Sequence, residues 1–145
     1  MIRSRPLLPL LAEAKELVVD ELHRRLHANG FEEIRPSHGC VFRFIQPQGT
    51  RLTVLADQSG FTKQAVGEVA DDLQRLGYVE RTPDPQDGRA KLICLTARGE
   101  QSRAAAFRIM AEIEAEWAER FGPARTAALR ELLEELTERA PAPAA

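Results

Sequence analysis

The sequence predicts a mainly α-helical fold with one small β-hairpin. Three observations lead to this prediction: apolar residues recur at helical spacing near both ends, two helical patterns flank a single glycine in the middle, and two β-prone runs surround a cluster of turn residues. Of the 145 residues, 43% are hydrophobic and 29% are charged. These values are typical of a folded protein and exclude disordered and collagen-like chains. We therefore expect residues 1–145 to form a single domain.

The first expected helix covers residues 7–26. Its apolar residues lie at positions 7, 11, 14, 18 and 22, which is the spacing of one helix face. Asn29 and Gly30 are suited to its C-terminal stop, because both residues accept the left-handed backbone conformation there. This pattern predicts a long amphipathic helix.

The start of the chain imitates a short signal sequence. Arg3 and Arg5 precede a run of leucines, but the charged residue Glu13 ends this run too early for a secretory segment. Nowhere do about 18 apolar residues occur together, as a membrane span requires. Two cysteines, Cys40 and Cys94, are too few for a disulfide framework and favour a reducing compartment. We therefore expect a cytoplasmic protein without membrane association.

A second, shorter helix is expected after Pro36 and before Pro47. Three apolar residues fall on its inner face, namely Val41, Phe44 and Ile45. Proline suits the first turn of a helix and stops one that precedes it, so these two prolines define the segment.

Residues 52–77 predict two helices joined by a tight turn. Ala56, Gly60 and Val66 have the spacing of a helix-turn-helix, in which a small residue allows close approach, a glycine makes the turn and an aliphatic residue packs underneath. The second helix opens at Thr62. Its expected inner face consists of small and aliphatic residues: Ala65, Val66, Val69, Ala70, Leu73 and Leu76.

Two β-prone runs follow at residues 78–82 and 90–95, and the turn cluster 83–88 lies between them. A β-hairpin directly after a helix-turn-helix makes a winged helix, which we expect over residues 36–98. In such a fold the second helix enters the major groove of DNA, and the tip of the hairpin reaches the neighbouring minor groove.

Two more helices are expected in the C-terminal third. Large apolar residues recur at helical intervals from Phe107 to Phe121, and another stripe runs from Leu129 to Leu136. Gly122 separates the two patterns. Both helices resemble the first helix in carrying more apolar surface than a small chain covers by itself.

The terminal helices are therefore expected to form a dimerisation region from residues 1–30 and 100–139. A second copy of the chain covers the apolar stripes with two-fold symmetry. The alternative is a monomer whose terminal helices complete its own core. The tail, residues 140–145, contains only alanine and proline and is expected to be disordered.

The middle of the chain resembles the MarR family of bacterial transcription regulators. Residues 76–99 resemble the family's wing signature, whose core of Asp, any residue and Arg is matched by Asp87 and Arg89. Residues 62–66 resemble the start of its recognition helix. The resemblance implies a homodimer that binds a pseudo-palindromic operator as a repressor and is released by oxidation or by a small aromatic or anionic ligand. It also implies a ligand pocket between the dimerisation helices and the winged helix, with these candidate residues: His38, Phe42, Arg43 and Phe44.

Candidate DNA-reading residues lie at the start of the second helix of the helix-turn-helix. Thr62, Lys63 and Gln64 occupy its first turn, where side chains and free N–H groups point at whatever the helix end meets. Gln64 can pair with adenine, and Lys63 with guanine or phosphate. Gly67 costs about 1 kcal/mol relative to alanine in a helix interior. A close approach to DNA explains it; the alternative is a tolerated small residue.

Candidate wing residues are Arg89 and Asp87. Arg89 follows the turn glycine, where its guanidinium can extend into a narrow and strongly negative minor groove. DNA would repel an unpaired Asp87, so we expect it to orient Arg89 or a nearby arginine such as Arg81. The alternative is an exposed salt bridge that contributes little to stability.

Other patterns favour neither metal binding nor catalysis. His23 and His27 share a helix face, but no third ligand is identifiable, so a solvated face is expected. Cys40 is expected to be a buried small residue rather than a redox sensor, and Cys94 a core residue. No enzyme motif occurs, and we expect no enzyme, metal or cofactor.

A rival interpretation is a dimeric winged-helix module that binds protein without specific DNA binding. Residues 51–98 carry seven basic and seven acidic side chains, so their bulk charge does not favour nucleic acid. Binding to double-stranded DNA must therefore rest on positioned residues.

Overall fold

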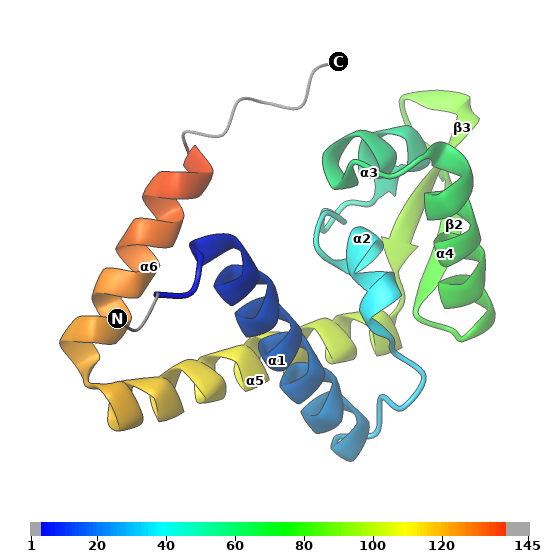
Figure 1. Cartoon of the computed structure of the whole chain (residues 1–145). Helices are drawn as coiled ribbons and strands as arrows, with labels where there is room; N and C mark the ends of the chain where they lie inside the picture. Colours follow the sequence, from blue (N-terminus) through cyan, green and yellow to red (C-terminus); the bar gives the residue numbers. More distant parts are fainter. Residues whose placement is uncertain (1–3, 139–145) are drawn as a thin grey trace.

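The computed structural model describes residues 4–138, and it is mainly helical with one small sheet (Figure 1). Its elements are α1 (Leu7–Ala28), the 3-10 turn η1 (Pro36–His38), α2 (Gly39–Phe42), β1 (Thr50–Arg51), α3 (Leu52–Ser59), α4 (Lys63–Arg75), β2 (Val79–Asp84), β3 (Asp87–Leu95), α5 (Ala97–Phe121) and α6 (Pro123–Glu138). The fold class predicted from the sequence is confirmed. The tail expected to be disordered, residues 140–145, lies outside the described residues.

The helix-turn-helix follows the expected pattern. Gly60 ends α3 with a φ of +76°, which is the left-handed conformation that the tight turn requires. Ala56 and Val66 are both buried where α3 and α4 meet. Around them lies the core of the winged helix, whose completely covered residues include Val41, Leu55, Ala70, Leu73 and Tyr78.

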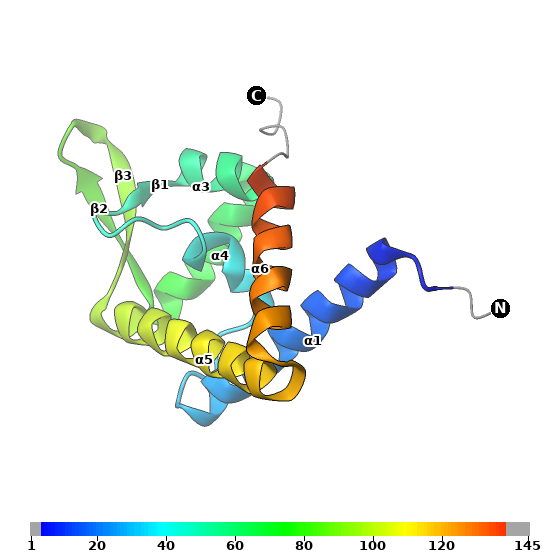
Figure 2. The same ribbon diagram turned by 90° about the vertical axis from the view of Figure 1, so that its left-hand side faces the viewer.

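The sheet has three antiparallel strands in the order β1-β3-β2. β1 is not predicted by the sequence pattern, because it contains only two residues and pairs with a strand far along the chain: Thr50 lies opposite Ile93. Gly49 allows this approach, since a Cβ there would lie 2.5 Å from Cys94 Sγ. β2 and β3 extend beyond the expected runs and form a hairpin that projects from the helices (Figure 2).

Two helices differ from their expected bounds. The segment after Pro36 contains only the 3-10 turn and the four residues of α2, so Phe44 and Ile45 lie beyond the helix. α5 begins at Ala97, well before the apolar stripe that starts at Phe107. The polar first turns of α5 lack an apolar pattern, and the cap is formed by Thr96, whose hydroxyl accepts a hydrogen bond from the Gly99 N–H.

The junction between α5 and the winged helix is closely packed. Thr96 donates a hydrogen bond from its hydroxyl to the Gly77 carbonyl at 2.6 Å. A Cβ on Gly99 would lie 2.1 Å from the Tyr78 carbonyl oxygen, so only glycine fits there. The first turn of α5 is therefore fixed directly to the start of β2.

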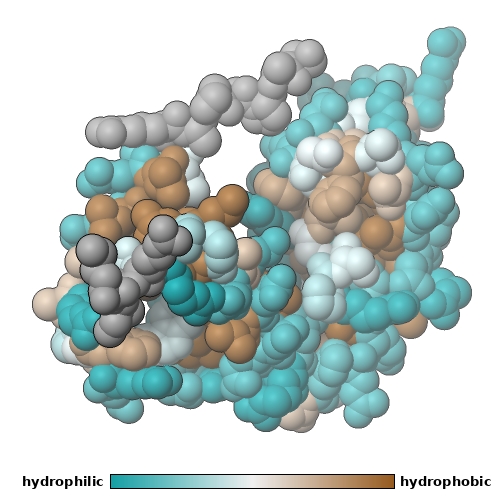
Figure 3. All heavy atoms as spheres, in the orientation of Figure 1, coloured by the Kyte–Doolittle hydropathy of each residue, from teal (hydrophilic) through white to brown (hydrophobic). Residues whose placement is uncertain are grey.

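α6 lies outside this core, whereas α1 joins it through the buried Leu26 near its C-terminal end. α1 crosses α5, and Arg25 joins them by donating to both carboxylate oxygens of Glu116, at 2.9 and 2.8 Å. No residue of α6 is buried, and hydrophobic residues gather at the surface around it (Figure 3). Within residues 4–138, no helix is both long and apolar enough to cross a membrane.

Candidate nucleic-acid interface

The first turn of α4 presents two exposed polar side chains, Lys63 and Gln64. Thr62 is the N-cap of this helix, and its hydroxyl oxygen accepts a hydrogen bond from the Ala65 N–H at 3.1 Å. The Thr62 hydroxyl is therefore engaged in the fold, whereas Gln64 makes only a long contact, 3.4 Å from its Nε2 to Glu68 Oε1. The two side chains next to the cap are the ones available for an external partner.

Gly67 is half-buried on the part of α4 that faces α3. A Cβ added there would lie 3.7 Å from Leu52 Cδ2, which is an ordinary van der Waals contact. The packing of α3 against α4 therefore does not require glycine at this position. The expectation that Gly67 permits close approach of DNA stays a prediction.

The wing positions Arg89 through backbone geometry. Asp87 Oδ1 accepts a hydrogen bond from the Arg89 N–H at 3.1 Å, so it orders the backbone of the turn rather than the guanidinium. The sequence also suggests Arg81 as a residue that Asp87 orients. This expectation is wrong, because Arg81 pairs with Asp71 on α4 at 2.8 Å. Arg89 itself is exposed near the tip of the hairpin.

An ion pair between Arg51 of β1 and Asp84 of β2, which we call the brace, joins β1 to the wing. The sequence pattern does not predict it. Asp84, only 8% exposed, accepts hydrogen bonds from Arg51 Nε at 2.8 Å and from the Gln86 N–H at 2.9 Å. The pKa of Asp84 lies below its usual value, chiefly because its carboxylate accepts the hydrogen bond from the Gln86 N–H and also because it accepts one from Arg51. The Arg51 guanidinium also lies 3.9 Å from Asp87. One arginine thus contacts both carboxylates of the hairpin turn.

The acidic residues further along α4 mostly face other parts of the protein. Asp71 pairs with Arg81, and Asp72 accepts a hydrogen bond from His38 at 2.7 Å. The His38 hydrogen bond, and then that of Arg75, lower the pKa of Asp72. These contacts reduce the electrostatic obstacle to an anion at the start of the helix.

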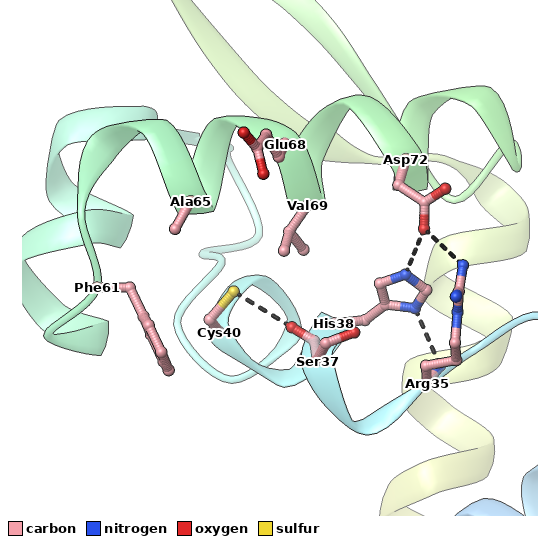
Figure 4. A pocket seen from close by; sticks show the side chains of 9 residues that line it. All are labelled: Arg35, Ser37, His38, Cys40, Phe61, Ala65, Glu68, Val69 and Asp72. Carbon is pink, nitrogen blue, oxygen red and sulfur yellow. Dashed lines mark hydrogen bonds and ion pairs between the residues drawn. The ribbon is translucent and has the colours of Figure 1, made fainter.

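Of the four residues predicted to bind a ligand, only His38 lines the cavity between α4 and the η1–α2 segment. His38 is buried: its Nδ1 accepts from the Arg35 N–H at 3.0 Å, so Nε2 carries the proton donated to Asp72 (Figure 4). Phe42 packs edge-on against Tyr78 with ring centroids 6.3 Å apart. Arg43 lies over the ring of Phe44, 5.1 Å from its centroid. Three of the four thus pack against neighbouring protein groups outside the cavity that His38 lines.

The remaining histidines and cysteines have local structural contacts. His23 Nδ1 lies 2.7 Å from the Val19 carbonyl oxygen, and His27 Nε2 lies 2.9 Å from that of Ile34. Cys40 is half-buried, and burial raises the pKa of its thiol. A higher pKa lowers the thiolate fraction and hence the reactivity toward oxidants. Cys94 is half-buried under Gly49 in the sheet.

Comparisons with known proteins agree with this architecture. The family model described as MarR family matches residues 34–90, which run from just before η1 into the first part of β3. The transcriptional regulator HosA of Escherichia coli O111:H- is 28% identical over 83 residues, and the match covers 57% of this chain and 62% of HosA. The chain therefore matches less than two thirds of that relative.

Solved structures extend the likeness to the terminal helices. The transcriptional regulator PA4135 is 27% identical with a TM-score of 0.71, over 95% of this chain and 100% of the other. A mutant of S. aureus MepR bound to an oligodeoxyribonucleotide has a TM-score of 0.63 at 21% identity, over 92% of this chain and 99% of that one. The second likeness concerns the fold alone.

Proposed function

We propose that this chain, which belongs to the MarR family, regulates transcription by binding double-stranded DNA as a two-fold homodimer. The observation that carries the proposal is that the winged helix exposes polar side chains on two of its elements, the start of α4 and the β2–β3 hairpin. Lys63 and Gln64 project from the first turn of α4, and Arg89 lies near the tip of the β2–β3 hairpin. A helix end suits the major groove and an arginine-bearing wing suits the minor groove.

The proposed dimer uses α1, α5 and α6. α6 exposes several large leucines, and so does the start of α1; among them are Leu7, Leu8, Leu129, Leu132 and Leu136. Apolar surface of this kind marks an interaction site in a soluble protein. A two-fold dimer covers the same patch on both copies and presents two α4 helices to one DNA duplex.

The assignment of roles within the interface follows from the side-chain chemistry. Gln64 reads adenine, Lys63 contacts guanine or phosphate, Arg89 enters the minor groove, and Asp87 holds the wing turn that carries it. Thr62 contributes as the cap of α4, and Gly67 allows close approach. The MepR complex with an oligodeoxyribonucleotide supports DNA as the partner.

The proposed regulator is a cytoplasmic repressor that a small aromatic or anionic ligand releases. The CouR structure of Rhodococcus jostii RHA1 contains p-coumaroyl-CoA, which supports ligand binding in a protein of this fold. Comparing operator affinity with and without candidate aromatic acids, at fixed salt, tests this part of the proposal. An affinity that none of them changes would contradict release by such ligands.

Selection of bound duplexes from a random pool tests the main proposal. We expect an inverted repeat whose half-site centres lie about 10 base pairs apart, because two α4 helices of a two-fold dimer must reach one face of the duplex. Inserting about 5 base pairs between the half-sites should reduce affinity to the non-specific level. A harmless insertion would contradict the two-fold arrangement.

Gln64→Ala tests the reading residue separately. It should relax the preference at one base pair per half-site by about 1–3 kcal/mol. An equal loss on all sequences would make Gln64 a phosphate contact. Affinity that does not fall with rising salt would instead favour the protein-interaction module, since DNA binding releases counterions.

A further inference from the structure

A surface cavity lies between α4 and the η1–α2 segment (Figure 4). It has a volume of about 380 Å³, and its lining consists of Arg35, Ser37, His38, Cys40, Phe61, Ala65, Glu68, Val69 and Asp72. Sites for small organic molecules begin at about 300 Å³. The cavity therefore has room for one aromatic ring with a short chain.

The two ends of this cavity differ in character. Phe61, Ala65 and Val69 line one end, and Cys40 lies opposite Val69 (Figure 4). Phe61 is 60% exposed, although it is a large apolar residue directly before the cap of α4. An exposed aromatic ring next to small apolar side chains offers a surface on which a second ring can pack.

The polar end is already satisfied by the protein itself. Asp72 accepts a hydrogen bond from His38 at 2.7 Å and pairs with Arg75 at 2.5 Å and with Arg35 at 3.3 Å. His38 has both ring nitrogens in use. A ligand therefore gains little from these groups, because it would have to displace existing contacts.

Glu68 is in a different situation. Its carboxylate lies along the apolar part of the cavity, and its hydrogen bond from Gln64 Nε2 is long, at 3.4 Å (Figure 4). The ion pairs that α4 makes within residues 4–138 involve Asp71 and Asp72, and none involves Glu68. The lining thus contains a carboxylate without an ion-pair partner in this part of the chain, which favours a positively charged ligand.

We propose that this cavity binds a small organic cation that carries an aromatic ring. Its ammonium or amidinium head pairs with the Glu68 carboxylate. Its aromatic ring packs against Phe61, Ala65 and Val69 at the apolar end of the cavity. Because Glu68 contacts Gln64, occupancy also changes the surroundings of a residue that we assign to base reading; this consequence alone rests on the proposed function.

A titration of the free, isotope-labelled protein tests the site without DNA. Two probes of similar size and opposite charge are used, 2-phenylethylammonium and 3-phenylpropanoate, and amide signals are followed by NMR. The cation should shift the signals of Phe61, Ala65 and Val69 saturably, whereas the anion should not. A failure of DNA binding leaves this result unaffected.

Two variants assign the charge and the ring. Glu68→Gln keeps the shape of the side chain and should weaken binding of the cation about fivefold, as expected for a partly exposed ion pair. Phe61→Ala should weaken it as well, and Glu80→Gln, which removes an exposed carboxylate from β2, is the matched control and should have no effect. Equal affinity of the wild type and Glu68→Gln, preference for the anion, or no saturable shift with either probe would overturn the proposal.

Discussion

The winged helix and the terminal helices carry the same kind of sequence pattern but bury it to different degrees. Leu55, Val66 and Leu73 of the winged helix are completely covered. In α6 no residue is buried, and Leu132 remains 65% exposed. A periodic apolar stripe thus predicts a helix in both regions, but it does not identify what covers the stripe.

This difference separates two sources of stability. The winged helix obtains its hydrophobic free energy, about 25 cal/mol per Å² of apolar surface, within one chain. α6 and the start of α1 leave large leucines exposed, so they gain this free energy only if a partner covers them, as in the proposed dimer. The first region should therefore respond to substitution at any concentration, and the second mainly through assembly.

The largest effect is expected in the winged-helix core. Leu55→Ala should lower the free energy of unfolding by about 2–5 kcal/mol, because it leaves a cavity in a completely buried site. Urea unfolding followed by circular dichroism measures this change. Leu132→Ala is the comparison, and at concentrations where the chain is monomeric it should cost much less. Equal losses would contradict the contrast between the two regions.

A charge on α6 should separate assembly from folding. Leu132→Glu should raise the dissociation constant of the dimer at least about tenfold, because a carboxylate in an apolar interface must be desolvated. Analytical ultracentrifugation over a dilution series measures it. Glu131→Gln changes a neighbouring exposed residue and should leave the assembly unaltered. A wild-type chain that stays monomeric at micromolar concentration would refute the dimer.

A smaller effect, confined to DNA, is expected at the wing. Arg89→Ala should weaken operator binding by roughly tenfold while the melting temperature stays nearly constant, because an exposed tip residue contributes little to folding. Fluorescence anisotropy and thermal unfolding give the two values. Arg125→Ala, which removes an exposed arginine from α6, is the control. Unchanged operator affinity would exclude Arg89 from the interface.

The smallest effect is a dependence of stability on acid. The pKa values of Asp84 and Asp72 are lowered in the folded protein, so their contribution is present above the unfolded value of about 3.9. It is lost as the pH falls through the folded values. The melting temperature should therefore decline below about pH 4, and Asp84→Asn should make the decline shallower. A slope that Asp84→Asn leaves unchanged would show that the Arg51 brace does not contribute.

Local features of the sequence predict most of the fold. Ala56, Gly60 and Val66 act within one helix hairpin, so their spacing alone indicates the turn and the packing. β1 has two residues and depends on Ile93, which is distant in the chain. Because no short-range pattern reports such a pairing, the third strand is absent from the sequence prediction.

The candidate site likewise contains local features that the sequence predicts and long-range contacts that it does not. The exposed first turn of α4 and the wing arginine follow from helix capping and turn chemistry, which are local. The brace between Arg51 and Asp84 joins residues on different strands, and the cavity near Glu68 forms only where α4 meets η1. His38 is predicted to bind a ligand, but it donates a hydrogen bond to Asp72 on α4 and so contributes to the fold. The sequence pattern does not report this distant partner.

The tight fit of Gly99 against Tyr78 fixes the N-terminal end of α5 to the winged helix, so the two should move as one rigid body. Nothing larger than hydrogen fits between the first turn of α5 and the start of β2, so the two cannot slide past each other. A helix of 25 residues is roughly 37 Å long at about 1.5 Å per residue. If α5 tilts by about 5° about its C-terminal end, where α6 begins, its N-terminal end moves by roughly 3 Å, as follows from that length. The winged helix, which is packed against this N-terminal end, moves with it. In the proposed dimer, a small change in the angle between the two copies would thus alter the distance between their two α4 helices.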